Sequence, residues 1–295
     1  MTMIGIDIGG TNIKAVRLDA AGQVLQSAHY PTPTQRDALI ERVRALLTEL
    51  GANADASVGI AAPGLADADN RAIQWMRGRL DCIEGLNWST HLNRPACVLN
   101  DAHAATLGEA WIGAAKNKQH VIMLTLGTGV GGGVIVHGKL LQGAIGRAGH
   151  LGHISLDPDG APDIVGTPGS LEDCIGAHAL HEQSDGRFEQ TVDLLAAAEG
   201  GDVEANRLWG TRVKALACAV VSLINAFDPE VVVLGGGMAQ AGDALFEPLA
   251  QWMAQLEWQP LGEGVPIVAA ALGETAGAIG AARFASMKHE TSEKR

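Results

Sequence analysis

The sequence predicts an α/β protein whose two halves enclose a ligand-binding cleft. Strand-like and helix-like segments alternate along the whole chain, and a strand that ends in glycines occurs three times, before 9–10, 127–133 and 235–237. No low-complexity linker divides the chain, and the boundary between the halves is expected near residues 113–119. Glycine turns at strand ends in two α/β halves are typical of a ligand held between them.

The first half contains the patterns of a hairpin, a helix and buried strands. Alternating apolar residues predict strands over 3–8 and 12–19, followed by a turn and a third strand at 24–30. An apolar stripe over 39–50, closed by Gly51, predicts a helix. Two further apolar runs predict buried strands, the second of which passes into an Ala-rich helix, over 57–64 and 96–113.

The second half repeats these patterns around its own glycine turn. Residues 120–143 predict a strand, a glycine turn, a second strand and a hairpin. Beyond them, amphipathic periodicity predicts helices and short apolar runs predict strands. The helices are expected over 204–227, 243–256 and 275–287, and the strands over 228–239 and 266–272.

Charge and cysteine content exclude several kinds of partner. The net charge is −12 and no basic run precedes the short tail at 288–295, so no nucleic-acid partner is expected. The four cysteines show no C-x-x-C spacing, which is typical of reduced thiols in the cytoplasm. There is no signal-peptide pattern and no uninterrupted apolar run of membrane-spanning length. We therefore expect a cytoplasmic protein without a membrane partner.

A single carboxylate, Asp7, lies in the first apolar strand just before Gly9, Gly10 and Thr11. Burying an unpaired carboxylate is costly, so a partner for its charge is expected. A turn without side chains lets phosphate oxygens approach backbone N–H groups, and the hydroxyls of Thr11 and Thr128 add donors. Asp7 can then face Mg²⁺ that bridges nucleotide phosphates, directly or through water. The alternative is that these turns are only tight hairpins and that Asp7 caps one of them.

Two familiar nucleotide-binding motifs match in part and are rejected. Residues 127–132 satisfy G-x-G-x-x-G, but a strand follows where the dinucleotide motif needs the N-terminus of a helix. Residues 133–140 are similar to a P-loop, but residues that favour extended structure fill the middle, and Leu140 replaces the hydroxyl that would hold Mg²⁺. The glycine-rich hairpin turns remain as the phosphate-binding candidates.

Several segments together resemble one known family. They are DIGGTNIKA, NDAHAATLGE, LTLGTGVGGGVI, GRAGHLGH and VVVLGGG, and the match runs from residue 4 to about 284. The chain resembles the ROK family of sugar kinases, within the sugar kinase, Hsp70 and actin superfamily. The segment NDAHAATLGE is similar to the glucokinase-like branch of that family.

The resemblance implies two ribonuclease-H-like α/β domains of the actin and hexokinase type, which close over ATP and a sugar. The small domain is expected to comprise residues 1–115 with a C-terminal helix over about 280–295, and the large domain residues 116–279. The resemblance also implies a homodimer or a dimer of dimers, and domain closure when the sugar binds.

Matched position by position, the family motifs imply the residues of a kinase site. Asp101 falls at the catalytic base, a carboxylate that accepts the proton of a sugar hydroxyl as the γ-phosphoryl group transfers. Asp7 is expected to hold Mg²⁺ through water. Contacts to the nucleotide and its phosphates are expected from Asp7, Gly9, Gly10, Thr11, Asn12, Lys14, Gly127, Thr128, Gly129, Gly235, Gly236 and Gly237. Sugar contacts are expected from Gly64, Asn100, Asp101, His150, His153 and Glu172.

The pair Asn100 and Asp101 also fits a structural interpretation. Both residue types are favoured at the N-cap of a helix, and an Ala-rich helix follows them directly. The two interpretations can hold together, because a cap would itself keep Asp101 at the cleft.

The chain departs from the family in the segment that usually binds zinc. Most members have three cysteines there, and these positions are occupied by Asp163, Val165 and Ser170. Valine cannot ligate a metal, and one histidine with Asp and Ser is a poor zinc site. We therefore predict that structural zinc is absent, although His153 and Glu172 are kept.

A second departure is His150, which stands where the family usually has a glutamate that contacts the sugar. A carboxylate only accepts hydrogen bonds, whereas a neutral imidazole offers one donor and one acceptor. Some N-acetylmannosamine kinases of the family share this histidine, which favours an amino sugar. A purely structural histidine is the other interpretation. Further along, His178 and His181 are interpreted as a solvated helix face.

The sequence thus predicts an ATP-dependent hexose kinase that phosphorylates the C6 hydroxyl of an aldohexose, with glucose as the first expected substrate. The alternative is a kinase of N-acetylmannosamine or N-acetylglucosamine. A non-catalytic sugar-sensing protein is the alternative from a different class. A repressor is not expected, because the repressors of this family carry a winged helix-turn-helix ahead of the first phosphate motif, and the position of Asp7 leaves no room for one.

Overall fold

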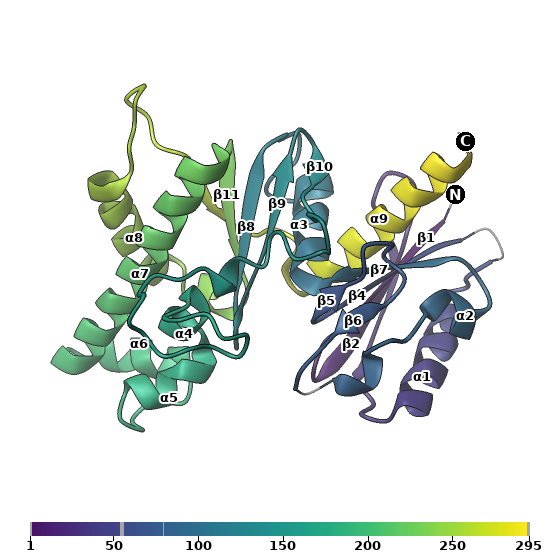
Figure 1. Cartoon of the computed structure of the whole chain (residues 1–295), viewed down its shortest axis with the longest axis horizontal. Helices are drawn as coiled ribbons and strands as arrows, with labels where there is room; N and C mark the ends of the chain where they lie inside the picture. Colours follow the sequence, from purple (N-terminus) through teal and green to yellow (C-terminus); the bar gives the residue numbers. More distant parts are fainter. Residues whose placement is uncertain (1, 54–55, 79, 294–295) are drawn as a thin grey trace.

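Two five-stranded sheets, one in each half of the chain, form the framework of the fold (Figure 1). The computed structural model describes residues 2–53, 56–78 and 80–293. The first sheet has the order β3-β2-β1-β4-β7, with β1 (Met3–Ile8), β2 (Asn12–Leu18), β3 (Val24–Pro31), β4 (Ser57–Ala62) and β7 (Ala96–Asn100). The second has the order β10-β9-β8-β11-β12, with β8 (Val121–Leu126), β9 (Val130–Val136), β10 (Lys139–Leu140), β11 (Val231–Gly235) and β12 (Ile267–Ala269).

The two sheets share one topology. β1 pairs antiparallel with β2 and parallel with β4, and β8 pairs in the same way with β9 and β11. Each glycine turn that is predicted to bind phosphate connects the first two strands of its own sheet. This repeated arrangement confirms the predicted α/β fold with two related halves.

Helices cover the sheets and bury the apolar stripes that the sequence predicts. Within the described residues they are α1 (Arg36–Glu49), α2 (Trp88–Leu92), α3 (Asp101–Ile112), α4 (Leu171–Ile175), α5 (Leu180–Gln183), α6 (Thr191–Glu199), α7 (Val203–Phe227), α8 (Asp243–Leu256) and α9 (Ala276–Glu293). Two short strands, β5 (Leu65–Ala66) and β6 (Ile73–Trp75), form an antiparallel ribbon. The short 3₁₀ helices are η1 (Asp81–Ile83), η2 (Leu151–His153), η3 (Ala177–Ala179), η4 (Gly237–Ala241) and η5 (Gly273–Thr275).

The long helix α7 meets the length and composition of a membrane span, and it is the one helix among the described residues that does. It packs against α4, α6 and α8, and it buries Trp209, Val213 and Leu216 in the apolar core of the second half. The core helix of a globular domain meets the same criterion, so we interpret α7 as a core helix.

The C-terminal helix α9 returns from the second half to cover the first sheet (Figure 1). Its first residue is Ala276, somewhat before the start near 280 expected for the C-terminal helix of the small domain. Glycines allow backbone to touch backbone: a Cβ added at Gly5 would lie 1.7 Å from the oxygen of Ala278. A Cβ at Gly280 would lie 1.6 Å from the oxygen of Ala104 on α3. The helix is therefore joined closely to both the sheet and α3.

The chain crosses between the halves after α3 and again before α9, and one buried carboxylate binds both crossings. Glu109 on α3 is 0% exposed. It accepts hydrogen bonds from the N–H of Ala114 (2.7 Å) in the first crossing, and from Ala271 (3.1 Å) and Leu272 (2.8 Å) in the second. Hydrogen bonds to a charged carboxylate are stronger than neutral ones. Glu109 thus ties the two crossings to each other.

Candidate active site

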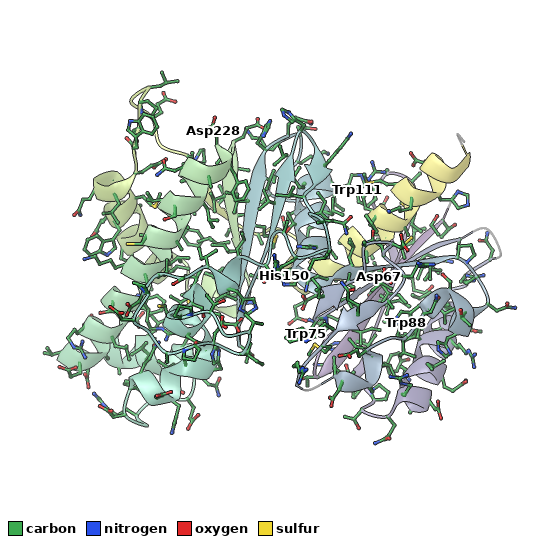
Figure 2. The ribbon with its side chains drawn as sticks, in the orientation of Figure 1. Asp67, Trp75, Trp88, Trp111, His150 and Asp228 are labelled. Carbon is green, nitrogen blue, oxygen red and sulfur yellow. The ribbon has the colours of Figure 1, made fainter. Side chains whose placement is uncertain are left out.

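A cleft of about 1370 Å³ lies between the two halves and collects most of the predicted site residues. His150, one of the residues that line it, lies between the two halves (Figure 2). The predicted residues that line the cleft are Gly10, Thr11, Gly64, Asn100, Asp101, Gly127, Thr128, Gly129, His150, His153, Glu172 and Gly236. The predicted residues that do not line it are Asp7, Gly9, Asn12, Lys14, Gly235 and Gly237.

The first glycine turn is fixed by a neighbouring threonine. The N–H of Gly9 donates to the oxygen of Asn12 (3.0 Å), which closes the turn between β1 and β2. Thr32, just beyond β3, donates its hydroxyl to the oxygen of Gly9 (2.7 Å) and its N–H to that of Thr11 (2.9 Å). Gly9 and Asn12 therefore shape the turn, while Gly10 and Thr11 are exposed at its tip in the cleft.

The second glycine turn is supported by Glu172 from α4. Gly127 donates its N–H to the oxygen of Gly129 (2.9 Å), and the carboxylate of Glu172 accepts the N–H of Val130 (2.7 Å). A Cβ at Gly129 would lie 2.4 Å from Oε2 of Glu172, so a side chain there would displace the carboxylate. Glu172, which was expected to contact the sugar, thus supports the turn that is predicted to bind phosphate.

Of the three glycines at 235–237, where β11 ends, Gly236 lines the cleft. Its φ is +84°, a left-handed conformation that favours glycine. A Cβ at Gly236 would lie 2.3 Å from the oxygen of Leu126. The absence of a side chain therefore lets the end of β11 approach the end of β8, immediately before the second glycine turn.

Asp7, near the end of β1, does not line the cleft, but it lies close enough to Asp101, at the start of α3, for the two charges to interact. Burial and the charge of Asp101 raise the pKa of Asp7 to about 7, against the opposite effect of Lys14. Burial also raises the pKa of Asp101, although hydrogen bonds from Ala102 and Asn100 oppose the shift. Two such carboxylates resist ionising together unless a cation lies nearby.

This arrangement fits a divalent cation bound through substrate phosphates. Mg²⁺ commonly takes one or two carboxylates, water and phosphate oxygens in place of a cage of protein ligands. The described part of the chain contains no cluster of three or more His, Cys, Asp or Glu able to hold a metal. A single, partly buried carboxylate, Asp7, is consistent with that mode. Lys14, its cross-strand partner, points its ammonium to Glu274 (3.2 Å) and does not line the cleft.

Asn100 caps α3 and thereby places Asp101 in the cleft. Its Oδ1 accepts the N–H groups of Ala102 (3.0 Å) and His103 (3.2 Å), so the N-cap interpretation is confirmed for Asn100. Its Nδ2 donates to the oxygen of Gly64 (3.0 Å). Both ends of the amide are therefore used within the protein, where they tie the Gly64 turn to the start of α3.

Comparison with known proteins now assigns the chain to a family. A model of the ROK family matches residues 3–288. The chain belongs to the ROK family. The resemblance stated from the sequence motifs is thus confirmed.

Individual ROK proteins are similar to this chain over nearly their full length. A glucokinase of Thermotoga maritima is 32% identical, with 96% of each chain covered. An N-acetylmannosamine kinase of Shigella flexneri is also 32% identical, over 97% of this chain and 98% of the relative. The crystal structure of a ROK family glucokinase from Streptomyces griseus, in complex with glucose and AMPPNP, has a TM-score of 0.80 at 28% identity and covers 97% of this chain and 100% of that one.

At His150 this ROK protein has a pair of imidazoles, of which His103 is buried and His150 is partly buried and lines the cleft. The rings of His150 and His103 meet edge to face, with centroids 5.2 Å apart. Burial lowers the pKa of each ring to about 4. Electrostatic repulsion lowers it further, from His150 for His103 and from His153 for His150. Both rings are therefore neutral at pH 7, and Nε2 of each is buried without a hydrogen-bond partner. Sequence patterns did not single out His103, because its partner lies far along the chain.

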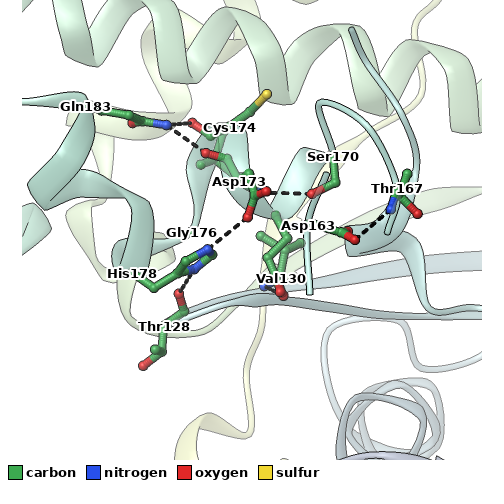
Figure 3. A network of polar contacts seen from close by, with 12 residues as sticks. Thr128, Val130, Asp163, Thr167, Ser170, Asp173, Cys174, Gly176, His178 and Gln183 are labelled. Atoms are coloured by element: carbon green, nitrogen blue, oxygen red, sulfur yellow. Dashed lines mark hydrogen bonds and ion pairs between the residues drawn. The ribbon is translucent and has the colours of Figure 1, made fainter. Parts of the chain in front are cut away.

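The segment that departs from the ROK zinc pattern is closed by hydrogen bonds around Asp163 (Figure 3). Its Oδ2 lies 2.8 Å from Nδ1 of His153, and its Oδ1 accepts the N–H groups of Val165 and Thr167, each at 2.9 Å. Asp163 occupies a cysteine position of the family pattern, so a carboxylate here bonds the histidine that zinc would otherwise bind. The absence of structural zinc stays a prediction.

Other residues of the cleft were not predicted. Met76 and Arg77 line it from the first half, and Arg147 and Ile164 from the second. They lie in irregular segments between named elements. No periodicity or glycine signature marks such positions, so sequence patterns give no signal for them.

Proposed function

We propose that this ROK protein is an ATP-dependent hexose kinase that transfers the γ-phosphoryl group to the C6 hydroxyl of an aldohexose, with glucose as the first substrate to test. The observation that supports this most is Asp101, which lines one cleft together with glycine turns from both sheets. The glucokinase of Thermotoga maritima and the glucose and AMPPNP bound to the Streptomyces griseus enzyme support the two substrates.

Asp101 is the proposed catalytic base. A sugar hydroxyl is a poor nucleophile, and a carboxylate within hydrogen-bond reach accepts its proton as the phosphoryl group transfers in line. Burial raises the pKa of Asp101, which makes its carboxylate a stronger proton acceptor than an exposed one. Oδ1 accepts the N–H of Ala102 at 2.9 Å, so we assign proton transfer to Oδ2.

The two glycine turns are the proposed phosphate site. Their backbone N–H groups, with the hydroxyls of Thr11 and Thr128, would donate to the phosphates. Mg²⁺, when bound, neutralises charge on the transferring group, and Asp7 would hold it through water. Residues 235–237 are proposed to lie along the adenosine. Lys14 is left out as a phosphate contact, because it pairs with Glu274.

An N-acetylhexosamine kinase is the second candidate, favoured by one observation. His150 in the cleft is a neutral imidazole, and such a ring can donate to or accept from an N-acetyl group. The similarity to the N-acetylmannosamine kinase of Shigella flexneri supports this candidate. A non-catalytic sugar-sensing protein is the third candidate, and the presence of both Asp7 and Asp101 argues against it.

The setting of the enzyme is also a proposal. We expect a cytoplasmic homodimer or dimer of dimers with no nucleic-acid or membrane partner. The close fit of α9 on the first sheet supports a small domain of residues 1–115 with the C-terminal helix, beside a large domain of 116–279. Sedimentation velocity tests the oligomer.

The first experiment measures ADP release with Mg-ATP and glucose, mannose, fructose, allose, N-acetylglucosamine or N-acetylmannosamine. We expect one of these sugars to be turned over by the wild type. Asp101→Asn should lower kcat about 10²- to 10⁴-fold, because the base is removed while the amide keeps its shape. The side chain of Asp193 is exposed in the first turn of α6, so Asp193→Asn is the matched control and should keep the wild-type kcat.

Each outcome of the panel selects one candidate. Preference for N-acetylmannosamine over glucose would select the second candidate. Binding of a sugar without ADP release would support the sugar-sensing protein and overturn the kinase. A folded Asp101→Asn enzyme with full kcat would overturn the assignment of the base.

A further inference from the structure

A short segment after α4 lies directly against the second glycine turn. The N–H groups of Ala177 and His178 donate to the oxygens of Gly127 and Thr128, each at 3.0 Å. The ring of His178 adds a further contact, because its Nδ1 lies 2.9 Å from the same oxygen of Thr128. The turn proposed to bind phosphate is therefore held from behind by this segment.

The other ring nitrogen of His178 also faces an acceptor. Its Nε2 lies 2.9 Å from Oδ1 of Asp173 (Figure 3). A carbonyl oxygen and a carboxylate can only accept, and a neutral imidazole has a single N–H. His178 can therefore make both hydrogen bonds only as an imidazolium, with a proton on each nitrogen.

Charged groups around His178 favour that proton. Burial lowers the pKa of His178, but hydrogen bonds with Thr128 and Asp173, together with the charges of Glu172 and Asp173, raise it above its usual value. The turn at 127–129 has no titratable side chain. On α5, His181 is itself paired with Glu189 (2.8 Å).

The segment is in turn fixed to the core of the second half. Arg212 on α7 is 2% exposed and donates to the oxygens of Ile175 (2.5 Å) and Gly176 (3.2 Å). Gln183 on α5 donates to the oxygen of Asp173 (2.7 Å). These contacts hold His178 in a defined place relative to the turn, so a change in its protonation acts on the turn itself.

We propose that His178 is a positioning residue for nucleotide binding, which as an imidazolium holds the turn at 127–129 in its phosphate-binding shape. The inference rests on the proposed function, because the turn is taken to bind the phosphates of ATP. The pKa of His178 is raised in the folded protein, so the ring is protonated and makes both hydrogen bonds at any pH below its usual value of 6.5. As the pH rises through the pKa of folded His178, one hydrogen bond is lost and ATP binds more weakly.

The test compares the KM for ATP between about pH 6 and pH 9 in wild type and two variants. The wild-type KM should rise about tenfold over this range. His178→Asn should show the high KM throughout, because its amide is neutral and too short to reach both acceptors. His178→Arg should show the low KM throughout, since a guanidinium stays charged and offers several donors. The kcat of each is expected to change little.

His181→Asn is the matched control, because it removes a neighbouring ion-paired imidazole that does not contact the turn. It should reproduce the wild-type pH profile. Ring nitrogen NMR signals, assigned by their loss in His178→Asn, give a second readout in the free protein. Below about pH 6.5, both nitrogens of His178 should be protonated.

A neutral His178 ring below that pH, or a ratio of His178→Asn to wild-type KM that does not change with pH, would overturn the inference. Failure of the proposed function looks different. If the wild type phosphorylates no sugar, calorimetric titration with ADP still measures how nucleotide affinity depends on pH. That titration then decides for or against His178 without turnover.

Discussion

The surroundings of the histidines around the cleft shift the pKa of their rings in opposite directions. Burial lowers the pKa of His103 and His150 to about 4. Two hydrogen-bond acceptors and two nearby carboxylates outweigh burial at His178 and raise its pKa. One residue type is thus neutral at pH 7 in the pair of His103 and His150, whereas the surroundings of His178 favour the protonated ring. The type of side chain alone does not determine either state.

His103, the buried member of this pair, predicts that the protein is sensitive to acid. A histidine whose pKa is lowered by folding contributes stability that is present above its unfolded value of 6.5 and lost as the pH falls toward about 4. As the pH falls from 6.5 to about 4, the free energy of unfolding of the wild type should decrease by roughly 2–3 kcal/mol more than that of His103→Asn. Urea unfolding measures both. His29→Asn, exposed on β3, should behave as wild type. Equal losses in wild type and His103→Asn would show that the pair is not the source.

At the scale of elements, contacts from segments distant in sequence decide how the loops are placed. The first glycine turn depends on Thr32 beyond β3, and the second depends on Glu172 and His178 around α4. The start of α3 is tied to the Gly64 turn by Asn100. Each loop of the site is therefore supported by a side chain that its own sequence motif does not contain.

The crossings between the halves provide the prediction at this scale. Glu109→Gln should lower the free energy of unfolding by about 2–4 kcal/mol, because the amide places an N–H₂ group against backbone N–H donors that a carboxylate accepts. Urea unfolding monitored by circular dichroism measures the change. Glu199→Gln, exposed at the end of α6, is the control. A Glu109→Gln protein as stable as wild type would mean that these hydrogen bonds contribute little.

At the scale of the whole molecule, the site arises from two sheets of the same topology that face one cleft. Each sheet contributes the turn between its first two strands, so the nucleotide phosphates would lie between equivalent loops. The chain passes between the halves at two places, both bound by Glu109. We expect any movement of one half relative to the other to take place about these crossings.

Sugar binding is therefore expected to close the cleft. Contacts to a sugar from both halves would stabilise a closed conformation, which would also exclude water from the transferring phosphoryl group. Small-angle scattering should show a smaller radius of gyration at saturating concentrations of the sugar that gives turnover. A sugar from the panel that gives no turnover serves as the control. An unchanged radius with the active sugar would contradict closure.

Much of the fold was predictable because its signals are local. Strand alternation, the stripe of α1 and the glycine turns all appear within a few residues, and the structure has elements at each of these places. Asp101 was singled out by the family motif that contains it, and its role as the base stays a prediction. Lys14 shows the limit of this approach, because its ion pair with Glu274 joins residues far apart in the sequence and no local pattern indicates it. His178 shows it again, since the sequence suggested only a solvated helix face.

The sequence by itself determined the α/β class, the two glycine turns, the family and the carboxylates Asp7 and Asp101. These depend on periodicity, on glycine and on motifs that a few neighbouring residues define. Only the tertiary structure revealed the contacts and the burial of Glu109, His103 and His178. Their hydrogen bonds and their burial depend on groups that folding brings close from distant parts of the chain, and desolvation and charge act through distance in space.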